Sequence, residues 1–391
     1  MNITAYKNKN VLFLSLGSGL LFFGFNAAEQ HFTAFYQTIG RQNLAYESLA
    51  ILYAAIILGN FIGPGIVGKI GARLAIIWGF VVYTLLVFGI VTKVTVIIYG
   101  LSFLLGIGAG VMGIARIELL RLIAPKQKRG EYSGAIDSVR TAGGFLGILA
   151  VGGLFRWLSI DNTLILLGLV MVTGTLLLLK LENVHDDSQT GVLLKQNFSL
   201  MLRLVKERTL LLIVPYSVAG GFLLGLVLGA IPAAIEKNFG IVWVSLIVSI
   251  FYLTSAMVPL LAGYLSDIKG RFGLIYASIL SSILAVIMFL QISGLPALAV
   301  IMIFLGLGGS LGSAAFSALI LDTFEDKAKE ATAVLGNLSL VLGVVPSFLL
   351  PRWLTQTQLL HLALVLSAGG LISVWLFTRL RIQFMKPNNL D

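Results

Sequence analysis

The sequence predicts an all-α membrane protein with twelve transmembrane helices in two pseudo-symmetric six-helix bundles. Apolar stretches of about 20 residues, the length that crosses roughly 30 Å of hydrocarbon as a helix, recur along all 391 residues. Hydrophobic residues make up 58% of the chain and charged residues only 11%, whereas soluble proteins carry roughly 25% charged residues. Segments of the first half also recur in the second half, which indicates a duplicated bundle.

Each apolar stretch is expected to be a helix, because a helix satisfies its backbone hydrogen bonds within the segment. Short alternating strands, which are typical of a membrane barrel, are not seen in the sequence. The expected helices lie near 11–36, 47–68, 74–92, 95–120, 133–155, 163–181, 209–235, 241–265, 273–292, 296–321, 331–351 and 360–380.

The longest connection between these stretches, from Glu182 to Arg208, divides the chain into two sets of six helices. We therefore expect an N-terminal bundle over residues 1–183, a linker over 184–207 and a C-terminal bundle over 208–391. Four apolar linker residues share one helical face, which is typical of an amphipathic helix on a membrane surface. A partly ordered tether is the alternative. The four residues are Leu194, Phe198, Met201 and Val205.

Lysine and arginine are distributed unevenly between the two sides of the expected bundle. With a cytoplasmic N-terminus, 22 of the 27 basic residues lie on the cytoplasmic side and 5 on the other. This excess follows the positive-inside rule and explains the net charge of +10 without a nucleic-acid partner. We expect a monomeric, multi-pass protein of the plasma (cell inner) membrane, with both termini in the cytoplasm and no cleaved signal peptide.

Several kinds of chemistry are excluded by composition and spacing. Cysteine is absent and the three histidines are scattered, so we expect no disulfide and no metal site. No nucleophile–base pair or pair of carboxylates occurs at useful spacing, and we predict neither an enzyme nor a cofactor. Residues 108–113 match G-x-G-x-x-G, but no strand precedes them, so these glycines are predicted to pack helices.

Two segments of the first half reappear about 200 residues later, in one register. LGIGAGVMG at 105–113 corresponds to LGLGGSLGS at 305–313, and GPGIVGKIGAR at 63–73 corresponds to GYLSDIKGRFG at 263–273. These matches predict two six-helix bundles related by an axis along the membrane normal.

The later of these segments resembles a hairpin motif of the major facilitator superfamily, and the resemblance covers nearly the whole chain. The motif reads Gly-x-x-x-Asp-Arg/Lys-x-Gly-Arg/Lys-Arg/Lys and stands between helices 2 and 3 and between helices 8 and 9. The later copy retains Gly263, Asp267, Gly270 and Arg271. In the earlier copy, Gly68 stands where the aspartate belongs. The resemblance implies a secondary transporter with a central cavity between its bundles.

In the superfamily this hairpin forms a charge latch that holds the cytoplasmic ends of the bundles together. The resemblance implies this role for Asp267 and Arg271, and breaking the latch would shift a two-state population. A positively charged loop with one turn-forming aspartate is the alternative. The residues expected at the cytoplasmic gate are Asp267, Arg271, Lys69, Arg73, Asp137 and Arg140.

The first half has a narrower resemblance. Residues 46–79 read YESLAILYAAIILGNFIGPGIVGKIGARLAIIWG and look like the superfamily branch of animal ion-channel regulators and receptor-trafficking proteins. That branch has Trp-x-x-Gln-Gly late in helix 4, where this chain reads GIARIELL at 113–120. The resemblance keeps a second function open, that of a non-transporting regulatory or chaperone-like membrane protein.

A polar stripe on the first helix is the main candidate for a functional site. Asn26, Glu29 and Gln30 fall on one helical face. Phe22 shares this face, whereas His31 points away from it. A carboxylate inside the membrane costs about 2.5–3.5 kcal/mol, so the stripe should face protein or a water-filled cavity. Because desolvation favours a proton on a carboxyl group, Glu29 suits proton coupling. The alternative is that Glu29 caps or pairs at the outer interface.

Charged residues also gather near the inner ends of helices 4 and 5. For an anionic substrate, Arg116 and Arg140 are the best candidates, because guanidinium binds carboxylate or phosphate through two hydrogen bonds. A structural ion-pair network with snorkelling side chains is an equal alternative. Other intramembrane polar residues line a cavity or, by default, hydrogen-bond between helices. These residues are Asn60, Tyr216, Tyr252, Ser310, Ser313 and Asn337.

Together these features predict a secondary active transporter that moves a small solute by alternating access and couples its movement to protons. The few charges in the membrane segments favour a neutral, amphipathic or singly charged solute. The residues predicted to bind substrate or protons are Asn26, Glu29, Gln30, Arg116, Tyr216 and Asn337.

Overall fold

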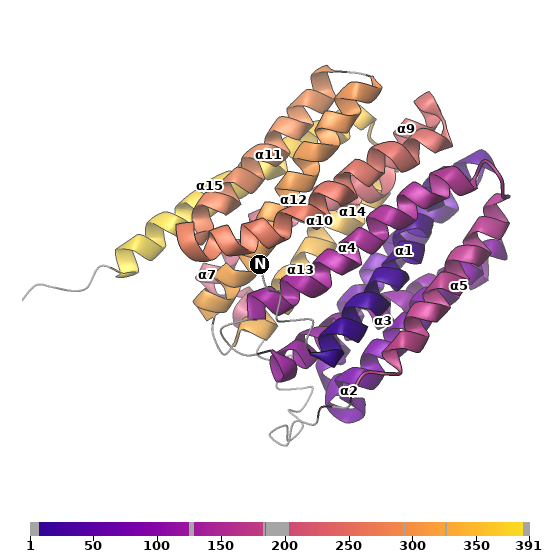
Figure 1. Cartoon of the computed structure of the whole chain (residues 1–391). Coiled ribbons are helices and arrows are strands. Elements are labelled where there is room, and N and C mark those ends of the chain that lie inside the picture. Colours follow the sequence, from indigo (N-terminus) through magenta and orange to yellow (C-terminus); the bar gives the residue numbers. More distant parts are fainter. Residues whose placement is uncertain are drawn as a thin grey trace, which may run out of the picture.

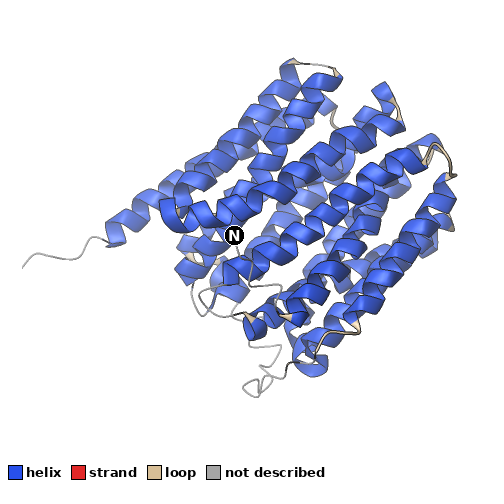
Figure 2. Cartoon of the chain, viewed as in Figure 1, coloured by secondary structure: helices blue, strands red, loops and turns tan. Residues whose placement is uncertain are grey.

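The computed structural model describes residues 8–124, 129–182, 184, 203–292, 294–324 and 327–385, which form helices joined by short turns (Figure 2). The linker residues Leu194, Phe198 and Met201 lie outside this part of the chain, so the amphipathic linker helix stays a prediction.

Five helices belong to the first half and a longer series of helical segments to the second. The first half contains α1 (Lys9–Thr38), α2 (Gln42–Val91), α3 (Thr95–Ile123), α4 (Arg129–Leu154) and α5 (Ile160–Leu178). The second half contains α7 (Arg208–Leu211), α8 (Val214–Gly225), η3 (Leu226–Ala230), α9 (Ile231–Phe239), α10 (Ile241–Lys269), α11 (Arg271–Gln291), α12 (Leu295–Phe324), α13 (Ala328–Ser339), η5 (Leu340–Val344), α14 (Val345–Leu349), η6 (Leu350–Arg352) and α15 (Gln356–Met385).

Eleven stretches of helix in the described residues are long and apolar enough to cross a membrane. The longest, Asn43–Val91, has 49 residues and contains two crossings that meet at Gly71. The segments from α7 to α9 form one crossing, Arg208–Phe239, and those from α13 to η6 form another, Ala331–Arg352. Twelve crossings result, and the predicted all-α membrane fold is confirmed.

The two halves repeat one backbone geometry. Gly71 breaks α2 with φ 82° and ψ 157°, and Gly270 joins α10 to α11 with φ 85° and ψ 158°. Only glycine adopts such a positive φ without strain, which explains a glycine at both places. Gly106 of α3 packs on the backbone of α2, and Gly306 of α12 packs on the backbone of α10 in the same way. Of the glycines predicted to pack helices at residues 108–113, Gly108 and Gly110 lie against α2, whereas Gly113 has nothing within 4 Å of an added Cβ.

Figure 1 shows the first half, from indigo to magenta, beside the second half, from pinkish red through orange to yellow, with their long helices running in roughly the same direction. We call the face where α1 begins and α15 ends the terminal face, and the other end the opposite face. The opposite face carries the turns that precede α2, α3 and α5. There Arg41 donates to the Lys93 carbonyl, and Lys93 pairs with Asp161 at 2.7 Å.

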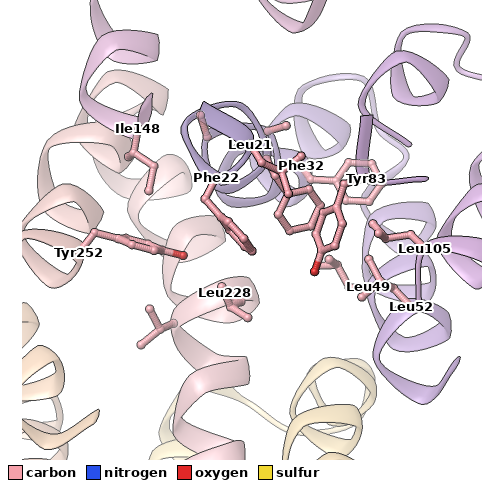
Figure 3. Close-up of a cluster of buried hydrophobic side chains, with 14 of the residues drawn as sticks. Leu21, Phe22, Phe32, Leu49, Leu52, Tyr83, Leu105, Ile148, Leu228 and Tyr252 are labelled. Atoms are coloured by element: carbon pink, nitrogen blue, oxygen red, sulfur yellow. The ribbon is translucent and has the colours of Figure 1, made fainter. Parts of the chain in front are cut away.

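Buried apolar side chains join the halves toward the opposite face. The larger cluster combines side chains of α1 to α5 with side chains of second-half segments from α8 to α15, and Figure 3 shows part of it. The smaller cluster lies nearer the terminal face and consists of second-half side chains, with Phe61 of α2 packed against it. The halves therefore share one core toward the opposite face.

Candidate functional site

The polar stripe of α1 lies inside the protein. Glu29 is only 5% exposed, and Gln30 and Thr33 are fully buried. Glu29 stands nine residues before the end of α1 at Thr38, which is about 13 Å along the helix axis. The carboxyl group therefore lies neither at the helix end nor on the lipid-facing surface of the described structure.

Glu29 is held by a hydroxyl group from α2. The Tyr53 hydroxyl donates to Glu29 Oε1 at 2.9 Å. The Tyr53 ring is stacked on Phe348 of α14, with ring centroids 5.4 Å apart. Two further tyrosines, Tyr83 of α2 and Tyr252 of α10, also interact electrostatically with Glu29. The carboxyl group thus lies where α1 and α2 meet the second half, and Tyr53 is a site residue that sequence reasoning missed.

Gln30 links α1 directly to the second half. Its Nε2 donates to the Tyr252 hydroxyl of α10 at 3.1 Å. Its Oε1 is buried without a hydrogen-bond partner among the described residues, and so is Oγ1 of Thr33. Unpaired buried acceptors are costly and are often satisfied by water or a ligand. Within the described structure, two buried oxygen atoms of this helix face, Gln30 Oε1 and Thr33 Oγ1, are therefore free to accept a hydrogen bond from water or a ligand.

His31 makes a second link to α10, from another side of α1. Its Nε2 lies 2.8 Å from the Ser245 hydroxyl, and its Nδ1 lies 2.8 Å from the Ala27 carbonyl. Its ring meets Phe155 edge to face. The expectation that His31 points away from the polar stripe is consistent with these contacts. Its contact with the second half was not expected, because no sequence pattern shows which helix lies beside it.

An amide pair joins α2 to α13. Asn60 Nδ2 donates to Asn337 Oδ1 at 2.7 Å, and Asn337 Nδ2 is buried without a partner in the described part of the chain. Tyr216, another residue predicted to bind substrate, has its described contacts within the second half. Its hydroxyl lies 3.4 Å from that of Ser278, and its ring packs on Phe316.

Two arginines of the first half contact the same carboxylate oxygen, between α3 and α4. Arg116 Nη1 of α3 lies 2.8 Å from Asp137 Oδ1 of α4, and Arg140 Nε lies 3.2 Å from the same oxygen. The Arg140 guanidinium also stands over the Phe22 ring of α1, 5.0 Å from its centroid. We call Arg116, Asp137 and Arg140 the arginine cluster. Sequence reasoning had placed Arg116 at the substrate site and Asp137 at the gate, and had named Arg140 both for the gate and, beside Arg116, for an anionic substrate.

Among the remaining gate residues that the structure describes, Arg73 and Arg271 have partners within their own halves and Lys69 is exposed. Arg73 Nη2 donates to the Leu179 carbonyl at 2.7 Å, and Lys69 is exposed near the end of the first part of α2. Arg271 pairs with Asp322 of α12 at 2.5 Å. The Asp267 side chain lies outside the described residues, so its latch with Arg271 stays a prediction.

An ion pair at the opposite face ties the two halves together. The Glu47 carboxylate of α2 accepts hydrogen bonds from Arg352 of η6 and from the Tyr99 hydroxyl of α3. Sequence reasoning assigned no role to these three residues. Arg352 is one of only 5 basic residues on its side of the bundle, which is the signal that singles it out.

A surface groove lies away from this region. It has a volume of about 680 Å³ and runs between α4 and α10 near the start of α12. Its lining is apolar except for Ser249, and it includes the exposed side chains Leu149, Trp243 and Leu246. In a bilayer such a surface faces acyl chains, so it carries none of the polar chemistry described above.

The chain matches the sequence profile of the Major Facilitator Superfamily over residues 10–348. It belongs to that superfamily. The fold agrees with solved structures of a nucleoside transporter: a mutant of NupG superposes with a TM-score of 0.72 at 15% identity, covering 95% of this chain and 99% of the other. A second NupG structure gives 0.69 at 15% identity, covering 97% and 99%.

The superfamily is one of multi-pass membrane transporters, so the chain is not an enzyme. Among curated proteins it is similar to the UNC93-like protein MFSD11 of Xenopus tropicalis, with 28% identity over 138 residues. That match covers 34% of this chain and 31% of the relative, so it spans about a third of each protein. The likeness is distant homology within the superfamily.

Proposed function

We propose that the chain is a secondary active transporter that moves a small solute by alternating access, with Glu29 as the proton-coupling carboxyl. The observation that carries the proposal is the position of Glu29, buried between the two halves and held by the Tyr53 hydroxyl. A carboxyl group that is exposed first to one side of the membrane and then to the other can bind a proton on one side and release it on the other, which couples proton movement to solute movement.

The links between the halves support a molecule closed at one face. His31–Ser245, Gln30–Tyr252 and Asn60–Asn337 lie in the interior, and Glu47–Arg352 lies at the opposite face. Among the described residues, the ion pairs nearer the terminal face stay within one half. With the terminal face in the cytoplasm, as the basic residues favour, these described links support an inward-facing arrangement. Transport requires these links to break while others form.

Uptake into proteoliposomes tests the proposal. The solute panel should include nucleosides, which the NupG structures suggest, and organic anions, cations and neutral solutes, each with and without an imposed pH gradient. We expect Glu29→Gln to abolish gradient-driven uptake while the protein remains monodisperse. Glu182→Gln changes an exposed carboxylate and serves as the matched control.

Full uptake by Glu29→Gln, with an unchanged response to the pH gradient, would remove Glu29 from the mechanism. A correctly folded wild-type protein that moves none of the solutes would favour the non-transporting regulatory function instead.

A further inference from the structure

We propose that the arginine cluster binds the anionic group of a monovalent organic anion, and that Glu29 carries the proton that travels with it. The inference rests on the proposed function and names the substrate class of the same site. The observation behind it is the geometry of Arg116, Asp137 and Arg140 next to Phe22.

The arginine cluster has one more positive charge than negative charge. Arg116 and Arg140 both meet the same oxygen of Asp137, each through one described nitrogen. Their side chains are 32% and 35% exposed, so the remaining guanidinium N–H groups are accessible to a ligand. A guanidinium binds a carboxylate through two parallel hydrogen bonds. A positive charge inside a membrane bundle is stabilised by an anion, so the cluster favours one further negative group.

The arginine cluster and Glu29 stand at two ends of one aromatic region. Arg140 lies over Phe22, which precedes Glu29 by seven residues, so the two levels are about 10 Å apart along α1. Tyr83 and Tyr252 interact electrostatically with both Glu29 and Arg140. Figure 3 shows Phe22 between these tyrosines, one from each half. This arrangement suits a molecule with an anionic group and an apolar or aromatic body.

The charges balance for one proton and one anion. With Glu29 ionised and no solute bound, the cluster's single positive charge and the Glu29 charge cancel. With a monoanion on the cluster and a proton on Glu29, the sum is again zero. Moving the loaded site therefore moves no net charge, and neither membrane potential nor charge burial opposes it. With a neutral solute and a proton on Glu29 the site would carry one unbalanced positive charge, and a cation would be repelled by the cluster.

Among the described residues, the groups that interact with Glu29 do not disturb this balance. They are the hydroxyls of Tyr53, Tyr83 and Tyr252, which are neutral at physiological pH. The α14 side chain next to them, Phe348, does not titrate. His31 lies on α1 but contacts Ser245 and Phe155 instead. The proton is therefore taken up from water by a Glu29 carboxylate oxygen and is returned to water on the other side.

Ligand-induced thermal stabilisation of the detergent-purified protein tests this assignment. Three ligand sets, built on a benzene ring, an indole ring and a short alkyl chain, each contain a carboxylate, its amide and the corresponding amine. We expect a carboxylate to raise Tm more than its amide and amine, and to do so more strongly at mildly acidic than at mildly alkaline pH.

Variants separate the two roles. Arg140→Gln should weaken carboxylate binding roughly tenfold to a hundredfold, as expected for loss of charge-assisted hydrogen bonds. Arg156→Gln, an exposed arginine near the opposite face, should leave it unchanged. Glu29→Gln should retain carboxylate binding but lose its pH dependence.

The assignment is overturned if the amides or amines bind as well as the carboxylates, if no carboxylate binds, or if Arg140→Gln binds like wild type. Such results leave the transport proposal standing when uptake of a neutral or cationic solute still depends on Glu29. Loss of both uptake and binding in wild type would remove the two proposals together.

Discussion

The two halves of the molecule have the same backbone plan but contribute different chemistry to their interface. Gly71 and Gly270 share one backbone conformation, and Gly106 and Gly306 make the same kind of helix contact. In and beside their interface, however, the described charged groups of the interior come from the first half: Glu29 is buried, and the arginine cluster is partly exposed. The second half contributes neutral groups to the contacts between the halves. These are Ser245, Tyr252, Asn337 and Phe348.

This difference shows that the close packing of helices and the placement of charged groups are under separate constraints. Backbones that approach closely leave no room for side chains, so the glycines have to recur in both halves. A charge in the membrane is costly, so placing it in one half only, opposite neutral hydrogen-bonding groups, limits that cost. The second half then moves against the charged groups without having to separate buried ion pairs.

The largest expected effect tests the shared packing. Gly106→Leu and Gly306→Leu each force a side chain into a neighbouring backbone, and each should cost about 3 kcal/mol of stability. Gly113→Leu and Gly309→Leu, where nothing lies within 4 Å of an added Cβ, are matched controls. Yield and gel-filtration profile measure the outcome. A severe loss of yield from only one of the two glycine substitutions would contradict the conclusion that both halves share the same packing.

The next effect tests the asymmetry of the chemistry. Tyr53→Phe removes the donor to Glu29, a hydrogen bond to a charged group worth about 1.5–3 kcal/mol, so uptake should fall roughly tenfold to a hundredfold. Tyr276→Phe removes a long contact within the second half, to Thr378, and should change uptake by no more than about twofold. Equal losses in the two variants would contradict the idea that the chemistry resides in the first half.

A smaller effect concerns the neutral partners. Ser245→Ala removes the hydroxyl that meets His31, a hydrogen bond worth about 0.5–1.5 kcal/mol, and should favour opening toward the opposite face roughly two- to tenfold. Because the chain has no cysteine, a single cysteine at Leu49 can report this opening through the rate of maleimide labelling.

Ser373→Ala removes a hydrogen bond within the second half, to the Leu212 carbonyl, and is the control for this measurement. Labelling that rises equally in both variants would mean that the His31 link does not hold the halves together.

The smallest effect concerns the ion pair at the opposite face. Arg352→Gln breaks its contact with Glu47, but both side chains are 35% exposed, and such pairs contribute about 0–1 kcal/mol. Labelling at Leu49 should rise by less than about fivefold, and added salt should move wild type in the same direction. A larger rise than with Ser245→Ala would place the main closure at the surface instead of the interior.

The fold was predictable because the solvent of this chain is lipid. Each crossing has to be a helix of about 20 apolar residues, and that requirement is readable from composition alone. The polar stripe at Asn26, Glu29 and Gln30 was predictable for the same reason, since a bilayer excludes such groups from its own side of a helix. The pairing of Arg116 with Asp137 was harder to predict, because both residues were expected near the inner membrane boundary but were assigned different roles.

By itself the sequence determined the number of helices, the duplication and the face of α1 that avoids lipid, because these follow from hydropathy and from helical spacing. Only the tertiary structure decided that Tyr53 holds Glu29, that His31 meets Ser245 and that two arginines share Asp137. Each of these pairs joins residues of different helices, and which helices become neighbours depends on how backbones and side chains of the whole bundle pack together.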